Sequence, residues 1–249
     1  MRFTWMILLL VTFPAWGYQF TPDFTNGFYW HSLPIKITVL ESDSERKQML
    51  EDLSQAAIHD WEDSSGLKLW DFSDEGSGAG VRNIIRWSEN FAAETNMDPD
   101  SVLAVAIRYT DGPYFAKTEI VINGNHQLNK YENYLRTTLT HELGHTMGLD
   151  HSEEMEAVMA PTLQAYYTGL HDDDVKGLND AHAETLRRQT TGYVSPLSYE
   201  TEQSAMQEPV SCATVATGPA MSFQSFLSIA GGILISFVRK FMKWFKSLL

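Results

Sequence analysis

The stretch His141–His151 constrains this chain more than any other part of it. Residues four apart share one face of a helix, so His141 and His145 can present two imidazoles to one cation. Gly148 lets the chain leave the helix in a conformation that costs other residues free energy, and His151 then returns as a third ligand. Three neutral nitrogen donors with one open position describe a catalytic zinc site, because a structural site is closed by four ligands. Glu142 follows the first ligand directly and can sit beside that open position, where a general base is needed.

Three further features extend this pattern. Ser152 follows the third histidine, Met159 stands eight residues beyond His151, and Leu170–Leu178 carries an acidic helix opening. Together these features resemble the metzincin zinc metallopeptidases, and in particular their matrixin branch. The resemblance implies an α+β, zincin-like fold with a twisted mixed sheet, an active-site helix and a small C-terminal subdomain below the cleft. It also implies that Met159 is a structural Met-turn beneath the metal, packing as an apolar floor.

The activity that this resemblance implies is zinc-dependent endopeptidase cleavage of a protein or peptide substrate. Glu142 would take a proton from the zinc-activated water and later deliver it to the leaving amine. Pro161 stands where other metzincin branches carry a zinc-binding tyrosine, which favours the matrixin branch. Leu163 replaces the tyrosine of the matrixin S1′ pocket, with Tyr166 or Tyr167 as substitutes. Pro161 and Leu163 are therefore the candidate wall of the substrate pocket.

Two hypotheses of other classes remain beside the endopeptidase. The first is a binding protein that keeps the zinc site without turnover, although an intact Glu142 speaks against it. The second makes a membrane-active C-terminal helix, released from the protease domain, the functional part. A protease without its tail should still cut peptides, and this distinguishes the hypotheses.

Composition narrows the partners and the metals. A formal net charge of −14 argues against a nucleic-acid partner. We separately expect the protein to be a monomer. Cys212 is the only cysteine, so no intramolecular disulfide can form. Matrixins are kept inactive by a cysteine in a propeptide before the catalytic domain, and we expect no such inhibition here, because no cysteine precedes the domain. The resemblance implies a second, structural zinc in the loop before the edge strand, but 109–115 lacks histidines, so we expect only the one catalytic Zn²⁺. Ca²⁺ is possible at acidic groups in two regions, namely Asp71, Asp74 and Glu75, or Asp98 and Asp100.

Periodicity predicts the elements that carry the site. Strands are expected at 35–39, 83–87, 102–106 and 118–123, and the resemblance makes the last one the edge strand that pairs with an extended substrate. A capping box at Ser42–Glu45 predicts a helix whose apolar positions rest on the sheet. A second box, Asn129 with Glu132, predicts the start of the active-site helix. The apolar positions are Met49, Leu53, Ala57 and Trp61 in the first helix, and Leu135, Leu139 and Leu143 in the second.

Composition also divides the chain into segments. Residues 1–17 read as a secretory signal peptide and 18–186 as the metallopeptidase domain, with its last helix at 172–186. Residues 187–219 read as a flexible linker, and 220–249 as a hydrophobic and basic amphipathic membrane or sorting segment. These segments predict an exported protein, extracellular or in the cell envelope, that is anchored to a membrane at its C-terminus.

Overall fold

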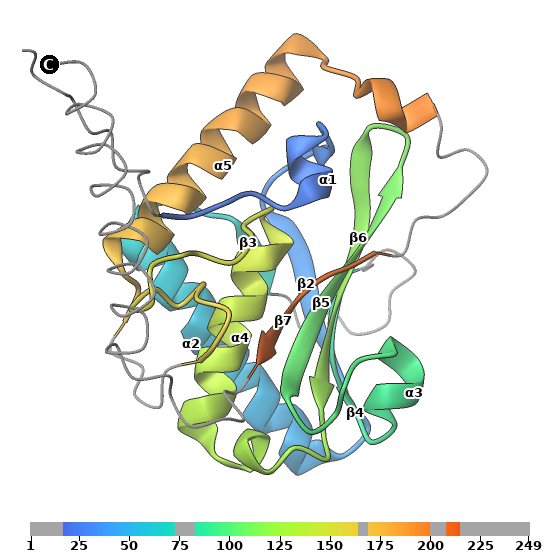
Figure 1. The fold of residues 1–249 in the computed structure, drawn as a ribbon, viewed down its shortest axis with the longest axis vertical. Helices are drawn as coiled ribbons and strands as arrows, with labels where there is room; N and C mark the ends of the chain where they lie inside the picture. The colour runs from blue at the N-terminus through green and yellow to red at the C-terminus, as the bar shows by residue number, and fades with distance from the viewer. Residues whose placement is uncertain (1–16, 73–82, 164–168, 200–207, 215–249) are drawn as a thin grey trace, which may run out of the picture. The chain divides into compact units, whose positions relative to one another are not determined.

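The computed structural model describes residues 17–72, 83–163 and 169–199, and the backbone of 208–214. Within these ranges one mixed sheet carries the fold, with strand order β3-β2-β4-β6-β5-β7, and β1 also pairs with β6 (Figure 1). The pairs β2–β3, β2–β4, β4–β6 and β1–β6 are parallel, whereas β5 runs antiparallel to both β6 and β7. The strands are β1 Tyr29–Trp30, β2 Ile35–Leu40, β3 Trp70–Phe72, β4 Asn83–Ser88, β5 Val102–Asp111, β6 Tyr114–Asn123 and β7 Glu208–Thr214.

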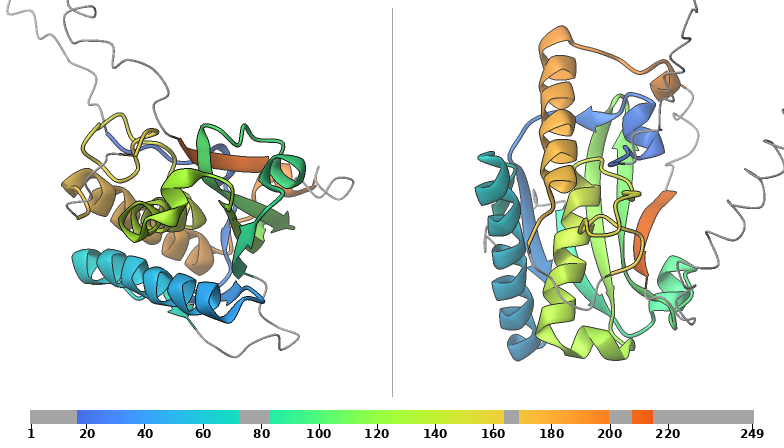
Figure 2. Two further views of the ribbon diagram at one scale, coloured as in Figure 1. Left: turned by 90° about the horizontal axis from the view of Figure 1, so that it is seen from below. Right: turned by 60° about the vertical axis from the view of Figure 1, so that its left-hand side comes forward.

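Helices cover both faces of this sheet. Most of the core lies on the face covered by α2, α4 and α5 (Figure 2). A smaller cluster lies under α3 on the other face, where Phe91 meets Val105 and Val121. The α+β, zincin-like fold expected from the sequence is therefore confirmed. The helices are α1 Pro22–Thr25, α2 Ser44–Ser65, α3 Phe91–Thr95, α4 Glu132–Thr146 and α5 Asp172–Thr191, with 3₁₀ turns η1 Gln127–Lys130 and η2 Pro196–Tyr199.

The four predicted strands form as β2, β4, β5 and β6, whereas no pattern predicts β1, β3 or β7, and the expected edge strand is wrong. The segment 118–123 belongs to β6, which has β4 on one side and β5 on the other. The border strands among the described residues are instead β3 and β7, and β5 lies one place in from the border, between β6 and β7. Both β5 and β6 bury long apolar runs, so hydrophobicity identifies each as a strand without naming its neighbours.

Helix α2 differs from expectation in its start and in its buried face. Its N-cap is Asp43 rather than Ser42, and the Asp43 carboxylate accepts a 2.8 Å hydrogen bond from Arg46 N. Its fully buried apolar residues include Leu50 and Ile58, whereas the expected Met49 and Leu53 are only partly buried. The face is rotated because α2 packs extensively against α4 as well as the sheet. The expected Ala57 and Trp61 are buried, together with Leu50 and Ile58.

The active-site helix α4 lacks the expected cap but has the expected core stripe. Its N-cap is Tyr131, which makes no side-chain capping hydrogen bond. The Asn129 amide instead donates to Leu103 O and Asn123 O, each at 2.8 Å, and joins the ends of β5 and β6. Asn129 therefore belongs to the turn η1 before the helix, and its amide is held against the two strands. Leu135, Leu139 and Leu143 are fully buried, as expected.

The C-terminal part is more ordered than a linker. Helix α5 continues to Thr191 and η2 follows, and Glu208–Thr214 adds strand β7 inside the segment expected to be flexible. Among the described residues no helix is long and apolar enough to cross a bilayer. The expected tail 220–249 and residues 1–16 of the expected signal peptide lie outside the described residues.

Candidate active site

Three histidines from α4 and the loop after it converge on one point. His141 and His145 lie one helical turn apart, with their Nε2 atoms 2.9 Å from each other. His151 completes the group, and one ligand atom of each residue lies within 4.8 Å of the others. Two nitrogens bound tetrahedrally to zinc at 2.0–2.1 Å stand about 3.3 Å apart, so small side-chain shifts suffice. It is the one such cluster of three or more potential ligands in the described ranges.

Backbone carbonyls select the tautomer of the two helical ligands. His141 Nδ1 lies 2.7 Å from Val158 O, and His145 Nδ1 lies 2.7 Å from Leu149 O. A carbonyl only accepts hydrogen bonds, so each Nδ1 carries the proton and each Nε2 keeps a lone pair. Two facing lone pairs repel each other unless a cation lies between them. The donor set therefore fits Zn²⁺.

Burial keeps the two helical histidines, His141 and His145, neutral. Burial lowers the pKa of His141 to about 3, with a further contribution from the nearby His151. Burial also lowers the pKa of His145 well below its ordinary value, assisted by His141 and His151. Neutral imidazoles are the form that binds a metal, so the fold prepares the ligands before the ion arrives.

Asp174 in the first turn of α5 holds the loop beneath the site. Its fully buried carboxylate accepts hydrogen bonds from Val158 N at 2.8 Å, Met159 N at 3.0 Å and His171 N at 2.8 Å. Burial raises the pKa of Asp174, although these three donors oppose the shift. The Val158 carbonyl accepts a hydrogen bond from His141, so Asp174 fixes the orientation of this ligand indirectly, by holding Val158. The sequence shows that the helix begins with acidic residues, but it does not show that the Asp174 side chain points inward.

Met159 packs directly on the helix that carries the ligands. It is fully buried, and a β-carbon added to Gly144 would lie 2.4 Å from its sulfur. The same added carbon would lie 3.0 Å from the Trp61 ring. Gly144 thus leaves the space into which the thioether fits, and the floor expected of Met159 is compatible with this position.

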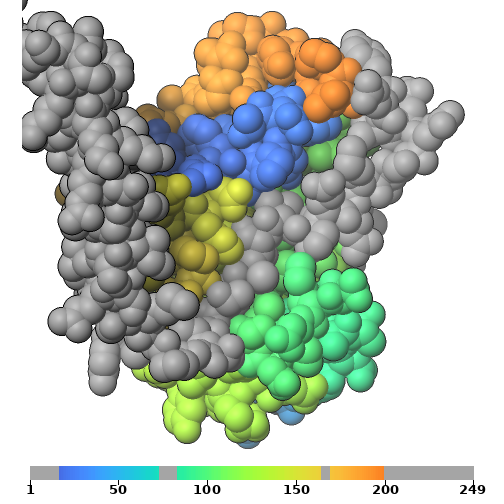
Figure 3. All heavy atoms as spheres, viewed as in Figure 1, coloured from blue at the N-terminus to red at the C-terminus, as the bar shows by residue number. Residues whose placement is uncertain are grey.

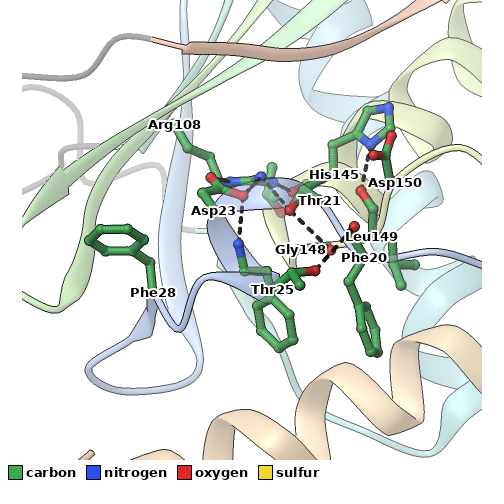
Figure 4. Close-up of polar contacts among 12 residues, drawn as sticks. Phe20, Thr21, Asp23, Thr25, Phe28, Arg108, His145, Gly148, Leu149 and Asp150 are labelled. Atoms are coloured by element: carbon green, nitrogen blue, oxygen red, sulfur yellow. Dashed lines mark hydrogen bonds and ion pairs between the residues drawn. The ribbon is translucent and has the colours of Figure 1, made fainter. Parts of the chain in front are cut away.

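Gly148 and a buried arginine fix the end of α4. Gly148 has φ +97°, the left-handed conformation expected of it, and a β-carbon there would lie 2.5 Å from the Phe24 ring. Arg108 of β5 is fully buried and donates to the His145 carbonyl, to Thr21 Oγ1 at 2.7 Å and to both carboxylate oxygens of Asp23 (Figure 4). Sequence patterns gave no signal for this residue, because its partners lie far away in the chain.

The N-terminal segment packs beside the ligand loop. Thr21 N donates to Gly148 O at 2.9 Å, Asp150 N donates to Gln19 O at 2.8 Å, and Phe20 bridges to Leu149. The space-filling view shows the segment between α5 and the loop after α4 (Figure 3). Burial alone would raise the pKa of Asp23, but the charge and hydrogen bonds of Arg108 outweigh it and hold that pKa below its usual value.

The remaining predicted residues lie around this centre. Glu142 is fully buried on α4, one residue after the first ligand. Pro161 is exposed and Leu163 is half-buried in the segment after Met159, and 164–168 lie outside the described residues.

The calcium candidates stay predictions. The Asp98 carboxylate accepts hydrogen bonds from Asp100 N and Ser101 Oγ, which also lower its pKa, Ser101 most. Asp74 and Glu75 lie outside the described residues.

A three-histidine cluster on a helix and the loop after it, beside a mixed sheet, defines the class of zincin-type metalloproteins. A family profile described as Matrixin matches residues 29–183, and the chain belongs to the matrixin family. It is 32% identical to mouse matrix metalloproteinase-19 over 133 residues, which cover 52% of this chain and 23% of that protein. It is 30% identical to human matrix metalloproteinase-19 over 127 residues, which cover 49% of this chain and 24% of that protein.

Proposed function

We propose that the chain is an exported zinc endopeptidase that hydrolyses protein or peptide substrates. The observation that carries the proposal is the 2.7 Å distance from the Nδ1 atom of both His141 and His145 to a backbone carbonyl, since a proton on each Nδ1 leaves both Nε2 lone pairs for one metal ion. His151 supplies the third donor. A set of three protein ligands with an open position is the arrangement of catalytic rather than structural zinc.

The chain's own residues would divide the work as follows. When bound, Zn²⁺ would activate a water molecule and polarise the scissile carbonyl. Glu142 would accept the proton of the attacking water and return it to the leaving amine. Its position supports this role, because Glu142 directly follows His141 on α4 and is buried away from bulk water. Asp174 and Arg108 would hold His141 and His145 in place through Val158 and the His145 carbonyl.

The test is Glu142→Gln, which should leave zinc content and the unfolding midpoint unchanged. Turnover of a quenched peptide should fall by about 10²–10⁴-fold, the range for loss of a general acid–base group. Glu132→Gln is the matched control, because Glu132 is an exposed glutamate in the first turn of the same helix. Wild-type turnover by Glu142→Gln would refute the role and favour the zinc-binding protein without turnover.

The ligand assignment has its own test. His151→Ala should lose zinc and activity together, whereas His59→Ala should lose neither, because the His59 side chain is 73% exposed on α2. Full zinc occupancy of His151→Ala by elemental analysis would show that the assignment is wrong.

The substrate pocket and the location belong to the same proposal. Pro161 and Leu163 offer no charge, so we expect an apolar residue on the carboxyl side of the cut. A cleavage profile dominated by charged residues at that subsite would contradict this. We further propose that 1–17 directs export, that 18–186 form the catalytic domain and that 220–249 hold it at a membrane, which fractionation and the intact mass of the mature protein would test.

A further inference from the structure

Strand β7 forms the border of the sheet next to helix α4. It pairs antiparallel with β5 from Val102↔Thr214 to Arg108↔Glu208, so β5 is covered on both sides. Without β7, β5 would end the sheet and present a row of free N–H and C=O groups. An extended peptide recognises such a row by adding itself as one more strand.

The same strand also lies against the helix that carries the metal ligands. β7 contacts α4 as well as β5, and it is drawn between them in Figure 1. α4 holds His141 and His145, and β5 holds Arg108, which donates to the His145 carbonyl. An extended chain bound along β5 and alongside α4 therefore passes next to the histidine cluster. This is the path that a peptide substrate would need in order to reach the metal.

We propose that β7 is an intramolecular inhibitor that occupies the substrate-pairing edge of β5, so that peptide substrates must displace it before cleavage. The proposal rests on the proposed function. A connection as short as residues 200–207 gives a tethered segment an effective concentration of about 1 mM. Typical KM values lie at about 1 μM–1 mM, so even a weakly paired segment of this chain competes with substrate.

The pairing between β5 and β7 is also irregular, which makes β7 easier to displace. Its register shifts twice, between Val102 and Ala104 and between Ala106 and Ile107. Each shift interrupts the ladder of hydrogen bonds, and Pro209 near the start of β7 has no backbone N–H to donate. An interrupted ladder holds its strand less firmly than a continuous one, so a well-matched peptide substrate can replace it.

The first experiment weakens β7 in the full-length protein. Ala213→Pro removes a backbone N–H within β7, whereas Ala216→Pro makes the same change beyond its last residue. If β7 covers the edge in nine molecules of ten, Ala213→Pro should lower KM for a quenched peptide about 10-fold at constant kcat. The control should keep the wild-type KM. An equal KM in all three proteins would overturn the proposal.

The second experiment locks β7 in place. Val105 and Cys212 are Cα partners, and Cys212 is the only cysteine, so Val105→Cys creates one cross-strand pair. Opposite residues of antiparallel strands have β-carbons about 4.5–5.5 Å apart, close enough for a disulfide after a small shift. Oxidation should form the disulfide, which intact mass would detect, and should lower peptide turnover at least 10-fold. Reductant should restore the turnover. The double variant Val105→Cys/Cys212→Ser should not respond to oxidation.

The outcomes separate the two proposals. A cross-linked enzyme with full turnover, or a pair that does not oxidise, overturns inhibition by β7. Cleavage within 208–214 that Glu142→Gln abolishes would make the segment a substrate and would also overturn it. If all variants cleave peptide with one KM, only the inhibition proposal fails. If none cleaves any peptide although zinc is bound, the proposed function fails and inhibition falls with it.

Discussion

Asp23 offers a direct test of how the end of the active-site helix is held. Asp23→Asn keeps the shape of the side chain but leaves the Arg108 guanidinium, whose side chain is 0% exposed, with only neutral partners. Removing one member of a buried ion pair costs about 3–5 kcal/mol. The Asp23 side chain is 19% exposed, so water reaches the pair and we expect the lower end, about 3 kcal/mol.

The assay is urea unfolding of the full-length protein at one fixed concentration of free zinc, because bound metal itself adds to stability. Asp60→Asn is the matched control. Asp60 pairs with Arg136 in the same forked geometry, but the two side chains are 21% and 39% exposed. Because the Arg136 side chain is exposed, whereas that of Arg108 is not, this pair should contribute only about 0–1 kcal/mol. Asp23→Leu/Arg108→Met should regain most of the loss, because it leaves no buried charge.

Acid should remove the difference between wild type and Asp23→Asn. The pKa of Asp23 is lowered in the folded state, so its contribution is complete above the unfolded value of about 3.9. The contribution is then lost as pH falls through the folded pKa, and the two unfolding midpoints should converge. If Asp23→Asn costs no more than Asp60→Asn at neutral pH, the reasoning from a buried charge is refuted.

Three further predictions concern the site and the last helix. Gly144→Ala should cost about 1–3 kcal/mol in thermal unfolding, because its β-carbon meets the Met159 sulfur and the Trp61 ring, and an unchanged midpoint would show that the floor can move. Asp174→Asn should weaken zinc about 10–100-fold in a chelator competition, because Asp174 supports His141 through Val158, and wild-type affinity would exclude that support. Arg187, followed by Arg188, lowers the pKa of Glu184 to about 2 against the opposing effect of burial. The stability that Glu184 contributes over Glu184→Gln should therefore be complete above about pH 4.3 and vanish as pH falls through about 2, and a pH-independent difference would contradict this.

The metal site was predictable because its main contacts are local. His141 and His145 share a face through helix geometry alone, and Gly148 and His151 follow within a few residues. The left-handed backbone of Gly148 and the buried stripe of Leu135, Leu139 and Leu143 follow from the same local rules. Patterns of this kind need no knowledge of the rest of the chain.

Other features were decided only by the tertiary structure. Apolar runs identified β5 and β6 as strands, but which of them lies nearer the border depends on pairing between distant segments. Arg108 finds Asp23 across 85 positions, and Asp174 reaches back to Val158 from the next helix. A segment expected to be linker returns as β7, because free groups on the border of a sheet accept any extended chain that is held nearby. Periodicity predicts which face of a helix or strand is buried. The element that packs against that face is decided by contacts between distant segments, which form only when the chain folds.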